Sequence, residues 1–223
     1  RMMMTGPLIK DRLAYTQSLE YRFIQTPTNS LPGSQRDTTF EGVNSYTQFD
    51  MNLTPKQTAT FSFAIYPQKV KYLGLNTFLP QESAPDYHQR GHQVYFQHRY
   101  ANSTQSLLTS QLSYKTFDTD ITPHGTDPYR MLVDTTEGSF FNLQSRRSSR
   151  LDWEETYQFA PMHFLGTHEW KAGVDYAHSH YDGRQTFYPV EIDNVSGMPI
   201  ERISYTAPAS ASINQNETAA FAS

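Results

Sequence analysis

Apolar and polar residues alternate along most of this chain, and this period-two pattern limits its possible folds more than any other feature. In the stretch FDMNLTPKQTATFSFAIY, residues 49–66, apolar side chains occupy every second position on both sides of a four-residue turn. Successive side chains of a β-strand point to opposite faces, so each such segment has one apolar face and one polar face. No segment shows a convincing helical period. The sequence therefore predicts an all-β chain.

The alternation predicts about eight strands. Their approximate ranges are 13–23, 46–53, 58–66, 92–100, 106–117, 143–159 and 168–179, and an eighth strand begins near residue 214. Most of these segments approach the length of about 9 to 11 residues that a strand needs to cross a bilayer. This is roughly twice the commonest strand length in soluble proteins, so the lengths favour membrane-spanning strands.

The connections between these segments alternate between short and long. Residues 54–57, 101–105 and 160–167 form short links, whereas 25–45, 67–91, 118–142 and 180–213 form long links that are rich in Pro and Gly. Long loops without secondary structure are uncommon in compact soluble domains. Barrels of bacterial outer membranes combine tight periplasmic turns with long extracellular loops. We therefore predict about eight antiparallel strands that form part of a transmembrane up-and-down β-barrel.

The charged residues of the predicted strands show which face meets lipid. They fall mainly on the polar side of the alternation, and a Lys or Arg facing the middle of a bilayer costs about 2 to 4 kcal/mol. Aromatic residues gather toward segment ends, as in interfacial girdles. The predicted lipid-facing residues are Phe61, Phe63, Ile65, Val94, Phe96, Leu108, Leu112, Trp153, Trp170 and Val174. The predicted lumen-facing residues are Arg99, Lys115, Lys171 and Asp175.

Composition and motifs exclude several other classes. The 223 residues carry a net charge of -4, without the basic cluster of a nucleic-acid-binding protein. The chain has no Cys and therefore no disulfide and no thiol nucleophile. It also lacks a run of about 18 apolar residues that could form a spanning helix. No catalytic or nucleotide-binding motif is present. We expect a protein that is not an enzyme and that has no catalytic residue, metal site or cofactor.

Two side-chain pairs have the residue types of a metal site or an acid–base site, and we interpret both pairs as structural. His178 and His180 share one strand face, but no third ligand has a convincing spacing for a metal. Glu154 and Glu155 are neighbours on a strand and so point to opposite faces, which opposes a shared acid–base site.

The long loops are the better candidates for recognition, because loops on a rigid scaffold commonly supply binding residues. The candidate ligand-facing loop residues are Tyr72, Tyr87, His88, Arg90, Asp120, His124, Tyr129 and Arg130.

The segment GPLIKDRLAYTQSLEYRF, Gly6 to Phe23, resembles an early barrel-strand motif of TonB-dependent outer-membrane receptors. The resemblance is to the Oar-like group with a carboxypeptidase-regulatory-like extension, in which Gly-Pro, two apolar residues and Lys-Asp-Lys/Arg precede an aromatic-rich strand. Later segments, such as NLTPKQTATFSF and HEWKAGVDYAHS, are similar in style to the same family.

This resemblance implies a 22-stranded barrel occluded by a plug domain, which imports a scarce nutrient when the TonB complex acts on the plug. We therefore expect residues 1–223 to be a partial barrel domain in the outer membrane of a Gram-negative bacterium, without plug and remaining strands. Its expected partners are outer-membrane lipid, the plug and remaining strands, the TonB complex through that plug, and an unknown nutrient. Two alternatives stay open: a soluble carbohydrate-binding β-sandwich and a complete eight-stranded outer-membrane barrel.

Overall fold

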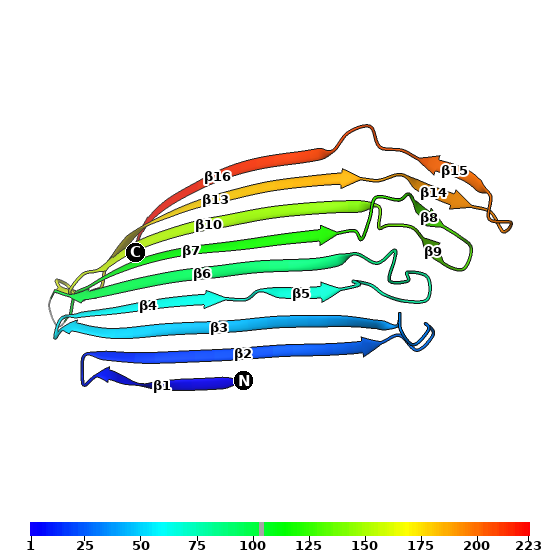
Figure 1. Cartoon of the computed structure of the whole chain (residues 1–223). Coiled ribbons are helices and arrows are strands. Elements are labelled where there is room, and N and C mark those ends of the chain that lie inside the picture. The colour runs from blue at the N-terminus through cyan, green and yellow to red at the C-terminus, as the bar shows by residue number, and fades with distance from the viewer. Residues whose placement is uncertain (103–104) are drawn as a thin grey trace.

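The computed structural model describes residues 1–102 and 105–223. Its main feature is one large antiparallel sheet whose strands follow one another in chain order (Figure 1). Across the sheet these strands are β1 (Met2–Ile9), β2 (Leu13–Pro27), β3 (Asp37–Thr54), β4 (Gln57–Ile65) with β5 (Gln68–Lys71), β6 (Asp86–Ala101), β7 (Leu107–Thr122), β10 (Asn142–Gln158), β13 (Lys171–Phe187) and β16 (Ala209–Ala222). The chain is thus all-β and has the up-and-down order of a barrel, as the sequence predicts.

In the part of the chain that the structure describes, no helix is long and apolar enough to cross a membrane.

Each of the eight predicted strands is present, but several are longer than predicted. β2 continues to Pro27, β3 begins at Asp37, β6 begins at Asp86 and β13 continues to Phe187. The extensions lie on the side of the long connections, which are correspondingly shorter. In addition, β1 pairs with β2 although the sequence pattern did not predict this strand.

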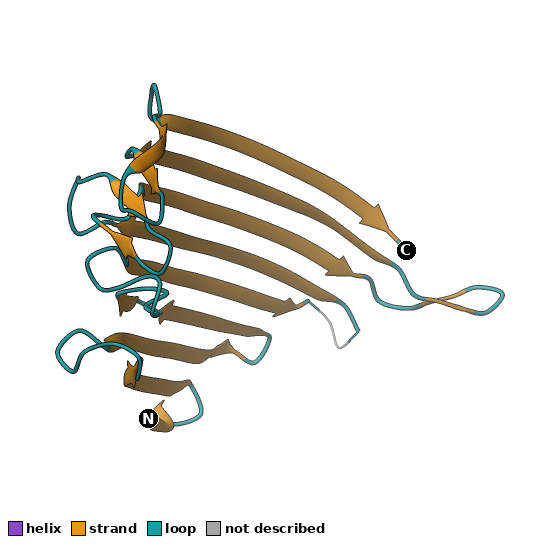
Figure 2. Cartoon of the chain, turned by 90° about the vertical axis from the view of Figure 1, so that its right-hand side faces the viewer, coloured by secondary structure: helices purple, strands orange, loops and turns teal. Residues whose placement is uncertain are grey.

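Short and long connections lie at opposite ends of the sheet, as predicted (Figure 1). At the long-loop end, a second sheet contains β8 (Tyr129–Met131), β9 (Thr136–Glu137), β14 (Val190–Asp193) and β15 (Pro199–Ile203) in the order β15-β14-β8-β9. At the other end, β11 (Met162–His163) and β12 (Thr167–His168) form a small hairpin. The hairpin projects beyond the neighbouring turns (Figure 2).

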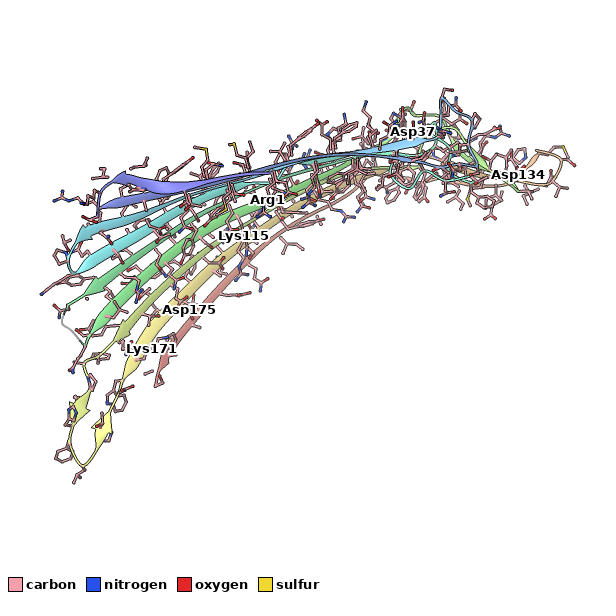
Figure 3. All side chains as sticks on the ribbon, turned by 90° about the horizontal axis from the view of Figure 1, so that it is seen from below. Arg1, Asp37, Lys115, Asp134, Lys171 and Asp175 are labelled. Atoms are coloured by element: carbon pink, nitrogen blue, oxygen red, sulfur yellow. The ribbon has the colours of Figure 1, made fainter. Side chains whose placement is uncertain are left out.

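The large sheet is a single layer (Figure 2), and side chains extend from both of its faces (Figure 3). Large apolar side chains remain exposed along one face, including Phe63 at 38%, Leu112 at 44% and Val174 at 39% of their full accessibility. In a β-sandwich these residues would be covered by a second sheet. The exposed apolar face therefore counts against the soluble sandwich.

The sheet has two free edges. In the described residues, β1 pairs only with β2 and β16 pairs only with β13. A complete eight-stranded barrel would require pairing between the first and last strands, because closure is what removes the edges of a barrel. The observed strand order therefore does not favour that alternative.

Candidate functional site

The strand register divides the large sheet into two chemically different faces. Residues directly opposite each other in an antiparallel pair lie on the same face. Along one such row, Gln97 pairs with Gln111, Gln111 with Glu154, and Glu154 with Asp175. Along the adjacent row, Phe96 pairs with Leu112, and Leu112 with Trp153. We call the first side the polar face and the second side the apolar face.

The predicted lumen-facing residues Arg99, Lys115, Lys171 and Asp175 all belong to the polar face by this register. Figure 3 labels three of them, Lys115, Lys171 and Asp175, along the large sheet. The Lys171 ammonium lies 5.5 Å from the centroid of the Phe221 ring, which is a favourable cation–π geometry.

The predicted lipid-facing residues, with one exception, lie on strands and share the apolar face. These are Phe61, Phe63, Ile65, Val94, Phe96, Leu108, Leu112, Trp153 and Val174. The exception is Trp170, which precedes β13 and is not part of a strand. Its carbonyl oxygen accepts a hydrogen bond from the Phe159 N–H at 2.9 Å. This bond joins the segment that follows β10 to the segment that precedes β13.

A charged cluster lies at the centre of the polar face. The Arg150 guanidinium donates to Asp152 at 2.6 Å and to the Ser179 hydroxyl at 3.3 Å, and it lies 3.7 Å from Glu217. The Ser113 hydroxyl also donates to Asp152, at 3.3 Å. One cation is thereby shared by groups on three strands, and this network ties the sheet together across β10, β13 and β16.

Two hollows of about 400 Å³ each adjoin at Arg150 on the polar face. The first is mainly acidic and hydroxylic, and its lining includes Tyr95, Gln111, Glu154, Asp175 and Glu217. The second lies nearer the long loops, and its lining includes Tyr66, Lys115, Phe117, Tyr181 and Ile213. Such a surface offers hydrogen-bonding groups and aromatic rings to a polar molecule or to a polar protein surface.

The Tyr66 ring lies over Gly91 toward the long-loop end of the polar face. A Cβ atom added to Gly91 would lie 2.1 Å from a ring carbon of Tyr66, so only glycine permits the ring to lie there. The Tyr66 hydroxyl donates to the Thr116 carbonyl oxygen at 3.4 Å. The ring therefore bridges β6 and β7 above the glycine.

The four long connections form a joined structure, which we call the loop layer: residues 28–36, 72–85, 123–141 and 188–208. The Thr28 hydroxyl donates to the Leu75 carbonyl oxygen at 3.4 Å, and the fully buried Ser83 hydroxyl donates to the Gly138 carbonyl oxygen at 2.9 Å. Parallel pairing of β8 with β14 joins the third connection to the fourth. Each long connection is thus bonded to its neighbour.

Arg130 is the electrostatic centre of the small sheet in this layer. Its guanidinium donates to Glu137 at 2.9 Å, lies 4.0 Å from Glu191 and also bonds Asp193, whose side chain is fully buried. The hydrogen bond that Arg130 donates to Asp193, together with the charge of that carboxylate, raises the pKa of the Arg130 guanidinium above its ordinary value. Arg130 is therefore fixed by structural partners.

The structure brings only some of the eight candidate ligand-facing residues together. The Tyr72 and His124 rings lie against each other in a tilted arrangement, with their centroids 5.1 Å apart, and His124 lies 3.3 Å from the Asp86 carboxylate. Tyr129 packs against Phe140 and Phe141 in the loop layer, with ring centroids 6.2 and 5.6 Å away.

The assignment of six of these eight candidates to loops was wrong, and two of the six, Tyr129 and Arg130, lie on β8 of the small sheet. Tyr87, His88 and Arg90 lie on β6, and Asp120 lies on β7. By register, His88, Arg90 and Asp120 lie on the same side of the sheet as the apolar face, but closer to the long loops than its apolar residues. Tyr87 belongs to the polar face. These strands continue past the region where one face is apolar, so the alternation that defines a strand in the sequence ends before the strand does.

The two side-chain pairs interpreted as structural have ordinary partners. His178 and His180 each share a hydrogen bond with an amide oxygen of β16, from Asn216 at 2.7 Å and from Asn214 at 2.8 Å. Within residues 1–102 and 105–223, no group of three or more potential ligands is arranged to hold a metal ion. Glu154 and Glu155 lie on opposite faces by register.

The fold resembles part of a solved outer membrane transporter and part of two further solved structures. Solved structures with this arrangement include the outer membrane transporter YddB from Escherichia coli, with a TM-score of 0.69 and 11% identity over 99% of this chain. P. aeruginosa FpvA bound to heterologous pyoverdines matches with a TM-score of 0.65 and 12% identity, also over 99% of the chain. FpvAI in complex with pyocin S2 gives a TM-score of 0.62 and 15% identity over 97% of the chain.

The likeness to these neighbours is one of fold. The chain spans about a third of their length: 31% of YddB, 35% of FpvA and 32% of FpvAI. No protein-family model matches the sequence, and no curated protein matches it either.

Proposed function

We propose that this chain forms part of the barrel wall of a TonB-dependent outer-membrane receptor, which binds and imports a nutrient. The observation that carries the proposal is the single-layer sheet with an exposed apolar face on one side and a charged face on the other. A barrel in lipid requires this distribution, because its outer surface meets acyl chains and its inner surface meets water. The protein is a transporter component in this proposal and does not catalyse a reaction.

The proposal places further strands beside this sheet and a plug domain against its polar face. The free edges of β1 and β16 expose unpaired backbone groups, which are costly in a bilayer unless another strand pairs with them. The hollows around Arg150 offer a polar surface that suits a plug or a passing solute. The Oar-like subgroup is proposed only from the resemblance of the Gly6 to Phe23 segment.

The absence of Cys allows a direct test of the two faces. Single variants Gln111→Cys, Leu112→Cys and Ser113→Cys place a nitroxide spin label at successive positions of β7 in protein reconstituted into lipid vesicles. We expect high collision with oxygen, which partitions into lipid, only at position 112. We expect high collision with a water-soluble nickel chelate at positions 111 and 113.

The same three labels define the refuting result. If the label at position 112 collides with the nickel chelate as often as its two neighbours do, the apolar face is not covered by lipid and the barrel-wall proposal fails. Labels at the matched positions Gln97, Phe96 and Tyr95 on β6 provide an independent repeat, since Phe96 pairs directly with Leu112.

We also propose that the loop layer recognises the nutrient. The paired Tyr72 and His124 rings, and the aromatic cluster around Tyr129, place aromatic side chains on a hydrogen-bonded support. Binding is tested by uptake of candidate nutrients in cells carrying Tyr72→Ala, with Tyr205→Ala as a control in the same layer. Loss of uptake with Tyr72→Ala alone supports recognition at this pair, and equal uptake by both variants contradicts it.

A further inference from the structure

A shallow hollow of about 220 Å³ lies on the apolar face at the long-loop end of the sheet. Its chemistry differs from the apolar surface beneath it, because its lining includes Glu41, Lys69, His88 and Arg90. The register places these residues on one face: Glu41 pairs with Lys69, and Lys69 pairs with His88. The hollow is therefore outside the polar face and outside the loop layer.

The hollow exists because the chain breaks its ladder between β4 and β5. Pro67 has no N–H to give to a neighbouring strand, and proline is tolerated in a sheet at such interruptions. The Pro67 carbonyl oxygen accepts a hydrogen bond from the Val43 N–H at 3.0 Å, which holds the interrupted segment against β3. The volume corresponds to roughly seven water molecules, which leaves space for a tetrahedral anion.

The lining of the hollow contains two cations, Lys69 and Arg90, and one carboxylate, Glu41. Lys69 has no ion pair among the residues that the structure describes. Arg90 lies 3.1 Å from Asp120, but Arg147 also bonds that carboxylate, at 2.8 Å, and the Arg90 side chain is 63% exposed. The single carboxylate in the lining, Glu41, already accepts a hydrogen bond from the Tyr21 hydroxyl at 3.0 Å. Donors thus remain available for an anionic ligand.

The hollow lies slightly beyond the expected level of the lipid headgroups. Arg90 is four residues beyond Val94 on β6, which is about 13 Å along the strand and about 10 Å along the membrane normal for a tilted barrel strand. The headgroup region extends only about 5 to 8 Å beyond the hydrocarbon on each side. Long Lys and Arg side chains can extend back toward the membrane over the difference between these two distances.

We propose that this hollow binds the phosphate group of a lipid in the leaflet at the long-loop side. Lys69 and Arg90 supply the positive charge, and a ring N–H of His88 adds a donor. The proposal rests on the proposed function, since it requires the apolar face to be in a membrane. Phosphate is the group expected here because Arg and Lys bind its oxygens through charge-assisted hydrogen bonds.

The test compares lipid retention by the reconstituted protein and its variants. Bilayer discs of phosphatidylcholine contain either phosphatidic acid, which has a terminal phosphate, or oleate, which has a carboxylate and no phosphate. Bound lipids are counted by native mass spectrometry after release from the disc. Wild-type protein is expected to retain phosphatidic acid in preference to oleate.

Matched variants identify the site. Lys69→Gln, which breaks no ion pair, is expected to weaken retention of phosphatidic acid about fivefold, and Lys69→Gln with Arg90→Gln about thirtyfold. The control Arg12→Gln with Lys56→Gln removes the same charge near the short turns and is expected to retain the lipid as wild type does. Inorganic phosphate added at millimolar concentration is expected to leave the lipid bound.

Each contrary result has a distinct meaning. If the protein inserts into vesicles but the Lys69 and Arg90 variants retain phosphatidic acid as wild type does, the lipid site is refuted and the barrel-wall proposal stands. Displacement of the lipid by inorganic phosphate would show an adventitious ion site only and would also refute it. If wild-type protein fails to float with vesicles, the proposed function fails and the lipid site fails with it.

Discussion

Replacing Leu112 by Arg tests the energetics of the apolar face, because Leu112 lies in the middle of it. Leu112 is flanked by Phe96 on β6 and Trp153 on β10, and its side chain is 44% exposed in the isolated sheet. An Arg at the bilayer midplane of a barrel costs about 2 to 4 kcal/mol. Loss of the lipid-exposed part of the leucine adds about 1 kcal/mol, since complete burial of such a side chain is worth about 1.5 to 3 kcal/mol.

The adjacent substitution Gln111→Arg is the matched control for this change. Gln111 lies on the polar face opposite Glu154, so an arginine there gains a carboxylate while losing the hydrogen bond from the Tyr95 hydroxyl at 3.0 Å. These two effects are each about 1 kcal/mol and of opposite sign. We therefore expect Gln111→Arg to change the free energy of unfolding by less than about 1 kcal/mol.

Reversible urea unfolding in lipid vesicles, followed by tryptophan fluorescence, measures both changes. We expect Leu112→Arg to lower the free energy of unfolding by about 3 to 5 kcal/mol, and the two variants to differ by at least about 2 kcal/mol. Equal destabilisation by both arginines would mean that the two faces meet the same solvent. That result would refute the assignment of lipid to the apolar face.

Two further predictions concern the polar face and the loop layer. Gly91→Ala should displace the Tyr66 ring, which lies 2.1 Å from the added Cβ, and destabilise the sheet by about 1 to 3 kcal/mol. In urea unfolding, combining this change with Tyr66→Ala should remove most of the added cost. Additive effects of the two substitutions would contradict the contact. Arg130→Ala should leave the buried Asp193 carboxylate without its main partner. Amide hydrogen exchange in β14 should then accelerate roughly tenfold, while exchange in β7 stays unchanged. Unchanged exchange in β14 would show that this ion pair does not stabilise the small sheet.

The sequence predicts the centre of each strand better than its ends. β6 was expected to begin at residue 92 and begins at Asp86, and β2 was expected to end at residue 23 and ends at Pro27. Alternation arises only where one face meets an apolar phase. Beyond that region both faces are polar, so the pattern disappears although the backbone ladder continues.

β1 was missed for a different reason. Its sequence MMMTGPLI has apolar residues at consecutive positions, and Pro7 argues against a central strand. Among the described residues this strand lies at the sheet edge, which is where proline is tolerated in a sheet. Only the pairing with β2 identifies it.

The candidate site is less predictable because its contacts depend on the register between distant strands. Alternation predicts Lys115 on the polar side of its strand, and the strand register agrees. The pairing of Arg150 with Glu217, 3.7 Å apart, joins β10 to β16 across β13 and cannot be read from either strand alone. The buried Asp193 likewise gives no sequence signal, because only the folded loop layer covers it.

The surplus strand length determines how the loop layer is supported. β3, β6, β7, β10 and β13 contain 16 to 18 residues, whereas crossing the bilayer requires about 9 to 11. The additional residues lie mainly at the long-loop end, where they extend the sheet by about 20 Å along the strands. Tyr72 and His124 are therefore carried on a hydrogen-bonded extension of the barrel, and the bonds between neighbouring connections restrain them further. In the proposed role of the loop layer in recognition, a surface supported in this way would lose little conformational freedom on binding, which favours affinity.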